Sequence, residues 1–503
     1  MFFAVCFLRN LNFKDEKHVL YIGTIQKDTS KWEFVMKKNL VKLPYSPLEK
    51  PFLNKKKTKE TKALMGFWAL ALSACGRSVD PDESGTSLVP TAFDDLLRGS
   101  SSVDSITGLA GNDTIYGFGG NDQILAGNGD DIIYGGEGDD YIDPGAGADR
   151  SYGGDGNDTI LLSSGSDIED GGEGIDTIVF NSTQSSLPIT IDLANGKYHY
   201  TEQIASASKT LFSIENIEST AASDVTVHDT VGQNTITTMS GNDIIHSKGG
   251  DDVISTGAGD DTVYLKTGNY TVDLGAGDDI VYLSTSMSIV EGGNGTDTAI
   301  FRAFDGFVDV NVDLKFSTYF VPSKLTAQDG MDVNLKSFET IQIEGNVAAT
   351  LRGTTGADTL TGDDGADVLE GRGGADTLTG GNRQDTFIFS TGDTGITEAT
   401  ADTITDFVSG NDIIDLTTIT DGNLGTYVEA NGAGNDFTQF ITNATASFSG
   451  SAVDIYSEYN LNGTGNTYFI VDEDSNGTAD AGDTLIILTG LASQDGLESS
   501  DFI

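Results

Sequence analysis

The stretch GLAGNDTIYGFGGNDQILAGNGDDIIYGGEGDDYID, residues 108–143, repeats every nine residues. Each unit places glycines among its first four residues, an aspartate at its sixth and a large apolar residue at its eighth. The glycines favour a turn because they tolerate positive φ and close backbone approach. The three residues after the aspartate can form a short strand whose apolar side chain points inward. Two units therefore predict one coil of about 18 residues, and parallel pairing would stack the coils about 4.8 Å apart.

The repeat recurs in three phased arrays, which is typical of stacked repeat proteins. Nine units cover residues 99–179, eight cover 229–300 and four cover 353–388. The predicted domains are an N-terminal segment (1–75), a linker (76–98), a first roll (99–180), a β insert (181–228), a second roll (229–301), a second β insert (302–352), a third roll (353–388) and a C-terminal region (389–503).

The aspartates at the sixth position are candidate calcium ligands. Stacked carboxylates on one side of the coils would lie about 5 Å apart, and at an effective dielectric constant near 20 each pair would repel by about 3 kcal/mol. A calcium ion between them reverses this effect because it binds hard oxygens from carboxylates and turn carbonyls. Folding would then depend on metal binding. The candidates are Asp104, Asp113, Asp122, Asp131, Asp140, Asp149, Asp158, Asp167, Asp176, Asp243, Asp252, Asp261, Asp279, Asp297, Asp358, Asp367, Asp376 and Asp385.

The unit G-G-x-G-x-D-x-U-x, with U a large apolar residue, resembles the RTX (hemolysin-type calcium-binding) repeat. The resemblance covers the three arrays, and it implies a parallel β-roll that binds several Ca²⁺ ions in its turns. Zinc is disfavoured because the arrays contain no cysteine and one histidine, His246.

Charge is distributed unevenly along the 503 residues, whose net charge is −49. Residues 1–62 hold 14 of the 28 Lys+Arg and 6 of the 77 Asp+Glu, so the rest carries 14 − 71 = −57. Such a chain would repel nucleic acid and would need cations to become compact. Its two cysteines, Cys6 and Cys75, allow no disulfide framework in the body of the chain.

The second array has unequal sides. Alternate units place Asp243, Asp261, Asp279 and Asp297 on one side, and Asn234, Asp252, Tyr270 and Ser288 on the other. The inward residues remain apolar on both sides, as at Val263, Val272, Val281 and Val290. We therefore expect one edge of this array to be loaded with calcium and the other to be mostly empty.

The segment that follows the repeats, residues 385–419, resembles the extension of the β-roll in serralysin-type proteases. The similarity lies in Phe387–Phe389, Asp402-Thr403-Ile404, Asp406-Phe407 and Asp412–Leu416. It implies a β-sandwich-like cap, so the complete fold expected is all-β, with a parallel roll in three arrays, β inserts and this cap. The protease itself is not implied, because none of the four histidines begins an H-E-x-x-H motif.

DEDSNGTADAGD, residues 472–483, has the spacing of an EF-hand calcium loop. Its flanks are typical of strands rather than helices, so a calcium site and a polar hairpin turn both remain open. The candidate ligands are Asp472, Asp474, Asn476, Thr478, Asp480 and Asp483.

Both ends of the chain resemble export signals, which belong to two different export routes. KKKTKETKALMGFWALALSAC, residues 55–75, has a basic region, a short apolar run and a sequence resembling a lipobox, in which Cys75 would be lipidated. The last residues, GLESSDFI, resemble the uncleaved signal of type I secretion. Both signals predict an extracellular or cell-surface location on a bacterium, with membrane contact only through a lipid anchor.

Three functions fit these features. The first is a calcium-folded surface or secreted protein with a structural or adhesin-like binding role and no catalytic domain, whose partner is a surface polysaccharide or another cell-surface protein. The second is an extracellular enzyme that acts on polysaccharide. The third is a calcium module that assists the secretion of a partner, with the type I machinery as a further contact.

Overall fold

The computed structural model describes residues 21–28, 31–38, 78–79 and 90–503, except 164, 182–187, 201–208, 284–287, 303–308, 315–332, 420–425, 431–435, 449–452, 460–464, 474, 490 and 492–496. The predicted lipidation site, Cys75, and the calcium-ligand candidate Asp474 lie outside the described residues. Strands β1 (Tyr21–Asp28) and β2 (Lys31–Lys38) form an antiparallel pair.

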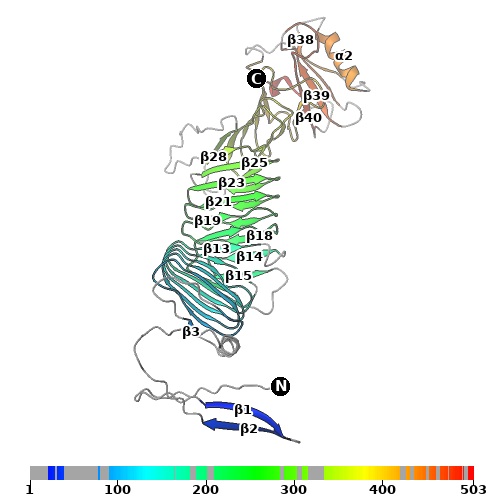
Figure 1. Ribbon diagram of the computed structural model, residues 1–503. Coiled ribbons are helices and arrows are strands. Elements are labelled where there is room, and N and C mark those ends of the chain that lie inside the picture. The colour runs from blue at the N-terminus through cyan, green and yellow to red at the C-terminus, as the bar shows by residue number, and fades with distance from the viewer. Residues whose placement is uncertain are drawn as a thin grey trace, which may run out of the picture.

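The repeats form stacked coils whose strands alternate between two walls (Figure 1). Within each array, neighbouring strands of a wall are parallel and 18 residues apart, as in the pairing of Ile133 with Ile115. The nine-residue period therefore gives two units per coil, as predicted.

Wall A is one continuous sheet. Its hydrogen-bonded order is β3 (Ser78–Val79), β4 (Leu96–Arg98), β6 (Thr114–Gly119), β8 (Ile132–Glu137), β10 (Arg150–Asp155), β12 (Ile168–Glu173), β16 (Thr210–Phe212), β15 (Lys197–Tyr200), β14 (Ile189–Asp192), β18 (Val225–His228), β20 (Ile244–His246), β22 (Thr262–Tyr264), β24 (Ile280–Leu283), β26 (Thr298–Arg302), β29 (Thr340–Glu344), β31 (Thr359–Thr361), β33 (Thr377–Thr379) and β35 (Asp402–Ile404).

The opposite side is built from two sheets. Wall B contains β5 (Ser105–Ala110), β7 (Gln123–Asn128), β9 (Tyr141–Asp143), β11 (Thr159–Leu161), β13 (Thr177–Phe180), β17 (Asn216–Ser219), β19 (Thr235–Thr237), β21 (Val253–Ala258), β23 (Tyr270–Ala276), β25 (Ser288–Asn294) and β28 (Val333–Lys336). Wall C contains β27 (Asp309–Asp313), β30 (Ala348–Arg352), β32 (Val368–Glu370), β34 (Thr386–Ile388) and β36 (Ile413–Asp415).

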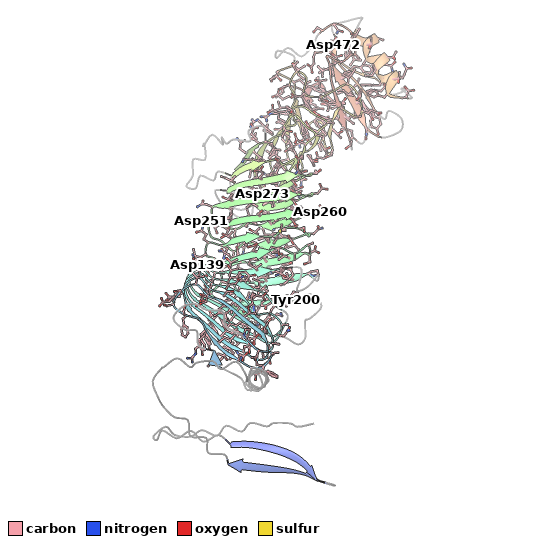
Figure 2. The ribbon with its side chains drawn as sticks, viewed as in Figure 1. Asp139, Tyr200, Asp251, Asp260, Asp273 and Asp472 are labelled. Atoms are coloured by element: carbon pink, nitrogen blue, oxygen red, sulfur yellow. The ribbon has the colours of Figure 1, made fainter. Side chains whose placement is uncertain are left out.

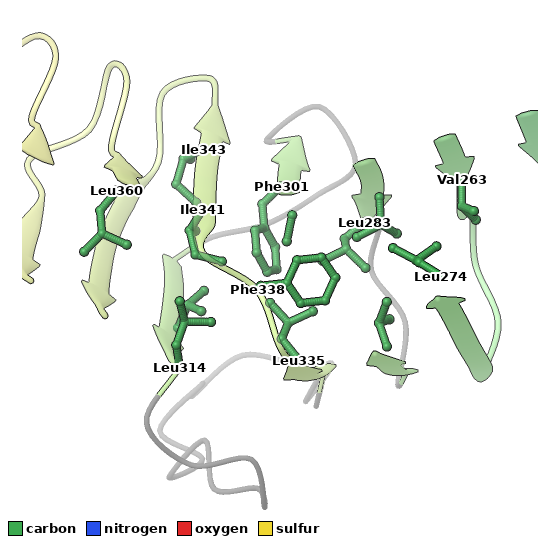
Figure 3. Close-up of a cluster of buried hydrophobic side chains, with 14 of the residues drawn as sticks. Val263, Leu274, Leu283, Phe301, Leu314, Leu335, Phe338, Ile341, Ile343 and Leu360 are labelled. Atoms are coloured by element: carbon green, nitrogen blue, oxygen red, sulfur yellow. The ribbon is translucent and has the colours of Figure 1, made fainter. Parts of the chain in front are cut away.

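Apolar residues at the eighth position fill the space between the walls. Ile106, Ile115, Ile124 and Ile133 are all fully buried. Figure 3 shows the core farther along, where the eighth-position residues Val263 and Leu360 are joined by other buried apolar side chains, among them Leu274, Phe301 and Phe338. Each such side chain contributes about 1.5–3 kcal/mol when it leaves water, so in most units one apolar residue at the eighth position stabilises the wall; Ser151 and Glu169 are the buried polar exceptions in the first array.

Some turn positions require the left-handed backbone that glycine adopts without strain. Gly129 and Gly138, at the fourth position of their units, have φ of 137° and 120°. Leu109 and Phe118 adopt φ of 82° and 78° at the second position, where most neighbouring units carry glycine. The backbone at the second position therefore favours glycine, and Leu109 and Phe118 adopt a strained conformation there.

We expect Leu109→Gly to stabilise the calcium-loaded protein by about 1 kcal/mol, because left-handed backbone strains a residue that has a Cβ atom. Leu109 is 49% exposed, so little packing is lost. Denaturant unfolding in saturating calcium measures the change. Ser105→Gly, at an exposed site of the same strand without positive φ, should destabilise instead. A lower unfolding midpoint for Leu109→Gly would contradict the strain argument.

The inserts extend the roll. In the first insert, β14 and β15 form an antiparallel hairpin, while β16 and β17 pair in parallel with the last strands of the first array, β12 and β13. In the second insert, β28 and β29 pair in parallel with β25 and β26. The three arrays predicted from the sequence are therefore joined through wall A.

The cap continues wall A with four strands. β40 (Thr484–Leu488) pairs with β35, and β39 (Thr467–Val471), β38 (Val453–Tyr459) and β37 (Thr426–Ala430) follow in order. One face packs on the roll's core, and the other packs on Phe440, Ala444 and Phe448 of helix α2 (Phe437–Phe448). In the described part of the cap, this unpredicted helix covers the sheet where a β-sandwich would place a second sheet.

The C-terminal residues dock on wall C. After the short helix η3 (Ser499–Asp501), Phe502 pairs with Ile414 and is buried between Tyr427 and Phe469. Asp501 accepts hydrogen bonds from the Ser409 hydroxyl and the Gly410 N–H. None of the helices in the described residues is long and apolar enough to cross a membrane.

Candidate metal centre

The aspartates at the sixth position form ladders along the turns. The Oδ1 atom of Asp122 accepts the backbone N–H of Asp104 at 2.8 Å, and the Oδ1 atom of Asp140 accepts that of Asp122 at 2.7 Å. Each carboxylate therefore reaches back to the preceding coil on its own side. Figure 2 shows the two sides, with Asp251 and Asp260 of consecutive units at opposite edges of the roll.

The second oxygen of most of these carboxylates is buried without a hydrogen-bond partner. A buried polar atom without a partner is costly and requires an explanation. A bound cation would explain these atoms, because it would contact the oxygen that has no hydrogen-bond partner in the protein. The atoms concerned are Oδ2 of Asp113, Asp122, Asp131, Asp140, Asp149, Asp158, Asp176, Asp243, Asp261, Asp279, Asp297, Asp367, Asp376 and Asp385.

In units that begin with glycine, this first residue leaves room for the oxygen. A Cβ atom added to Gly117 would lie 2.3 Å from Oδ2 of Asp122 and 2.4 Å from the carbonyl oxygen of Gly135 in the next coil. A carboxylate oxygen and a backbone carbonyl oxygen therefore converge beside this glycine. Hard oxygens of these two kinds are the ligands that Ca²⁺ prefers, so the residues present fit calcium.

We expect Gly117→Ala to lower calcium affinity at least tenfold, which corresponds to about 1.4 kcal/mol. The new methyl group would displace the Asp122 carboxylate from its position beside the carbonyl oxygen. Gly119→Ala is the matched control, because its added Cβ would have no contact closer than 3.7 Å. Calorimetric titration of calcium into both variants measures the difference. Equal affinities would show that the space beside Gly117 does not affect calcium binding.

Burial raises the pKa of ladder carboxyl groups such as Asp122 and Asp279, and like charge from adjacent carboxylates adds to the shift. The pKa is about 7 for Asp122, Asp158 and Asp279, and about 6 for Asp113 and Asp297. The metal-free ladder is therefore costly to keep ionised at neutral pH. A divalent cation would remove that cost.

At the beginning of two ladders, hydroxyl groups satisfy the Oδ2 atom of the first carboxylate, while Oδ1 of Asp358 is buried without a partner. Oδ2 of Asp104 accepts the N–H and the hydroxyl of Ser100 at 2.6 and 2.9 Å. Oδ2 of Asp358 accepts the same two groups of Thr354 at 2.6 and 3.0 Å. These candidates lie on the ladder, but one of their oxygens is already satisfied at Oδ2.

Five further carboxylates extend the ladders. The Asp113 carboxylate accepts the N–H of Asp95 in a unit upstream of the first predicted one. Beyond the arrays, Glu215, Glu339, Asp402 and Asp412 accept the N–H groups of Asp176, Asp297, Asp376 and Asp385 at 2.9, 2.9, 2.8 and 3.1 Å. Each of the five is followed two residues later by a buried apolar residue, and this acid-x-apolar pattern could have identified them in the sequence.

The second array differs between its two edges. On one edge the Oδ2 atoms of Asp243, Asp261, Asp279 and Asp297 have no hydrogen-bond partner. On the other edge, the Ser247 hydroxyl donates to Oδ2 of Asp252 at 2.9 Å and lies 3.0 Å from the buried Tyr270 hydroxyl. Neutral hydroxyl groups thus surround Asp252 on this second edge, while Oδ2 of Asp229 at the beginning of the same edge is also buried without a partner. Calcium loading of one edge alone stays a prediction.

Asp167 also departs from the pattern, because its Oδ2 atom contacts Lys209 at 3.4 Å and accepts the Tyr198 hydroxyl at 3.2 Å. Its place on the ladder is as predicted, and its partner is a lysine of the first insert.

The EF-hand-like segment is the loop between β39 and β40. Asp472 accepts the N–H groups of Asn476 and Gly477, and Asp483 accepts those of Glu473 and Asp480. The Thr478 hydroxyl donates to Asp480 at 2.9 Å. The described residues thus form a hairpin loop held by its own hydrogen bonds, flanked by strands as expected. Calcium binding there stays a prediction.

The walls and ladders together define a class of protein, the parallel β-rolls whose turns present stacked carboxylates. Within the described residues, no three Asp, Glu, His or Cys side chains converge as a ready-made metal site.

The RTX calcium-binding nonapeptide repeat (4 copies) matches the chain at residues 91–124, 116–151, 145–178, 228–263, 237–272 and 350–387. This chain therefore contains calcium-binding RTX repeats in all three arrays, and the first match includes the upstream unit of Asp95. No curated protein matches the chain. The ladder continues beyond the matched residues, through Asp279 and Asp297 to Glu339.

Proposed function

We propose that this protein is a calcium-folded secreted or cell-surface protein with a structural or adhesin-like binding role and no catalytic domain. The observation that carries the proposal is the series of buried ladder oxygens without partners. Extracellular calcium modules bind the ion with dissociation constants of about 10⁻⁴–10⁻³ M. The chain would therefore stay unfolded in a low-calcium cytosol and fold after export.

The distribution of charge supports this location. The ladders concentrate negative charge in the turns, and millimolar calcium outside the cell would neutralise it. Two routes to this location are open: a lipid on Cys75 would attach the protein to a membrane, or the C-terminal sequence would direct type I export. The expected partner is a surface polysaccharide or another cell-surface protein.

Protease treatment of intact cells tests this proposal. We expect a protease that cannot enter cells to degrade the protein rapidly when calcium is chelated and slowly in millimolar calcium. Cys75→Ala should shift the protein from the cell fraction to the medium if lipidation anchors it. Full protection from the protease both with and without chelator, until cells are lysed, would contradict a surface location.

A further inference from the structure

Lys209 occupies the ladder position that follows Asp167. β16 pairs with β12 so that Thr210 lies opposite Ile168. The N–H of Thr210 donates to the carbonyl oxygen of Asp167 at 3.0 Å, as the N–H of Thr177 does to that of Asp158 at 2.8 Å. Residue 209 is thus the register equivalent of a sixth-position aspartate in the next coil, and the chain places a lysine there.

The Lys209 ammonium group has the surroundings of a bound cation. It donates to the carbonyl oxygen of Ser163 at 2.8 Å and lies 3.4 Å from Oδ2 of Asp167. The rings of Tyr198 and Tyr200 lie 4.6 and 4.9 Å from it, within range of a cation–π contact. Lys209 is 4% exposed and Asp167 is fully buried, so water does not satisfy either charge.

The other edge of the same insert provides an internal comparison. Glu215 occupies the equivalent position after Asp176 and accepts its N–H, and Oδ2 of Asp176 remains without a partner. The insert therefore continues the carboxylate ladder on one edge and places a lysine at the matching position of the other. Asp149, one coil before Asp167, also keeps an Oδ2 atom without a partner.

We infer that the Lys209 ammonium group takes the place of a calcium ion beside Asp167, so that the ladder on this edge of the first array ends there without metal. The inference rests on the proposed binding of calcium by the other ladder positions. In the folded protein, the ammonium group of Lys209 ties the first insert to the roll without a metal ion at this position.

The placement of basic residues agrees with this role. After residue 62 the chain has 14 Lys+Arg against 71 Asp+Glu, so each buried cation is exceptional. At the second insert, Arg372 similarly binds both oxygens of Asp313, at 2.6 and 2.8 Å, and the carbonyl oxygen of Gly353. Basic side chains thus bind carboxylate and carbonyl oxygens where inserts join the roll.

The calcium content of the full chain, measured by equilibrium dialysis and atomic emission, tests the inference. We expect Lys209→Asp to bind one more calcium ion per chain than the wild type, because it restores the ladder carboxylate. Lys197→Met, which alters an exposed lysine of the same insert, should leave the calcium content unchanged. A folded Lys209→Asp protein with the wild-type content would overturn the inference.

A second variant covers the case in which Lys209→Asp does not fold. The double change Asp167→Asn with Lys209→Met removes both charges together, and we expect its calcium content to equal that of the wild type. The loss of one ion would show that Asp167 holds calcium and would overturn the inference. A wild-type protein that binds no calcium would instead refute the proposed function, so the two failures give different results.

Discussion

Removal of calcium at pH 8 is expected to abolish most of the β structure of the roll. Each pair of adjacent ionised carboxylates in a ladder repels by about 3 kcal/mol at an effective dielectric constant near 20. Whole domains are stable by only about 5–15 kcal/mol, so a few unneutralised pairs outweigh the stability of the fold. Circular dichroism in chelator and during titration to millimolar calcium measures the change.

The control for chelation is magnesium, which is smaller and gives up its water reluctantly, so it should restore far less β structure at the same concentration. Hydrogen exchange would locate the effect, because the amides between Asp113 and Asp158 should lose protection together. Equal β content in chelator and in calcium would show that apolar packing alone holds the roll, and would contradict the dependence on metal.

Acid is expected to replace calcium in part. In the metal-free fold, burial raises the pKa of Asp122, Asp243 and Asp376 from 3.8 to about 7. The folded chain then binds protons that the unfolded chain has already released, so the metal-free fold loses stability as pH rises from about 4 to 7. We therefore expect metal-free protein at pH 5 to regain much of the β structure that it lacks at pH 8.

The same groups set the pH dependence of calcium binding. Protons compete with calcium for the ladder oxygens, so calcium affinity should fall as pH decreases from 7 to 5. Calorimetric titrations at several pH values would record this fall. Sodium chloride at 1 M and pH 8 is the control, because salt screens buried charges poorly and should not imitate acid. Unchanged affinity at pH 5 would contradict the raised pKa values.

The sequence predicted the roll because its signal is repeated and local. An aspartate, a following apolar residue such as Ile133 and the glycines around them recur in register, so the coil length and the ladder positions follow from chain geometry. The unequal edges of the second array were also visible in the sequence, since Tyr270 and Ser288 stand where carboxylates are otherwise found. The helix Phe437–Phe448 was missed because it lies outside the periodic part of the chain.

The residues that complete the ladders depended on contacts between distant segments. Glu215 and Glu339 lie outside the nine-residue phase, and strand pairing alone brings them to the ends of the arrays. Asp167 looked like its neighbours in sequence, yet the structure gives it Lys209 as a partner, 42 residues away.

The sequence by itself determined that this protein is a coiled β-roll with stacked carboxylates, because one unit contains both the turn and the strand that generate it. Only the tertiary structure decided which carboxylate oxygens remain open to a cation. At three carboxylates the Oδ2 atom already has a partner from the chain, namely Ser100, Thr354 or Lys209. Their contacts depend on where the folded chain places a hydroxyl or an ammonium group. Periodicity predicts the ladder, whereas the partner of each oxygen is set by packing between coils.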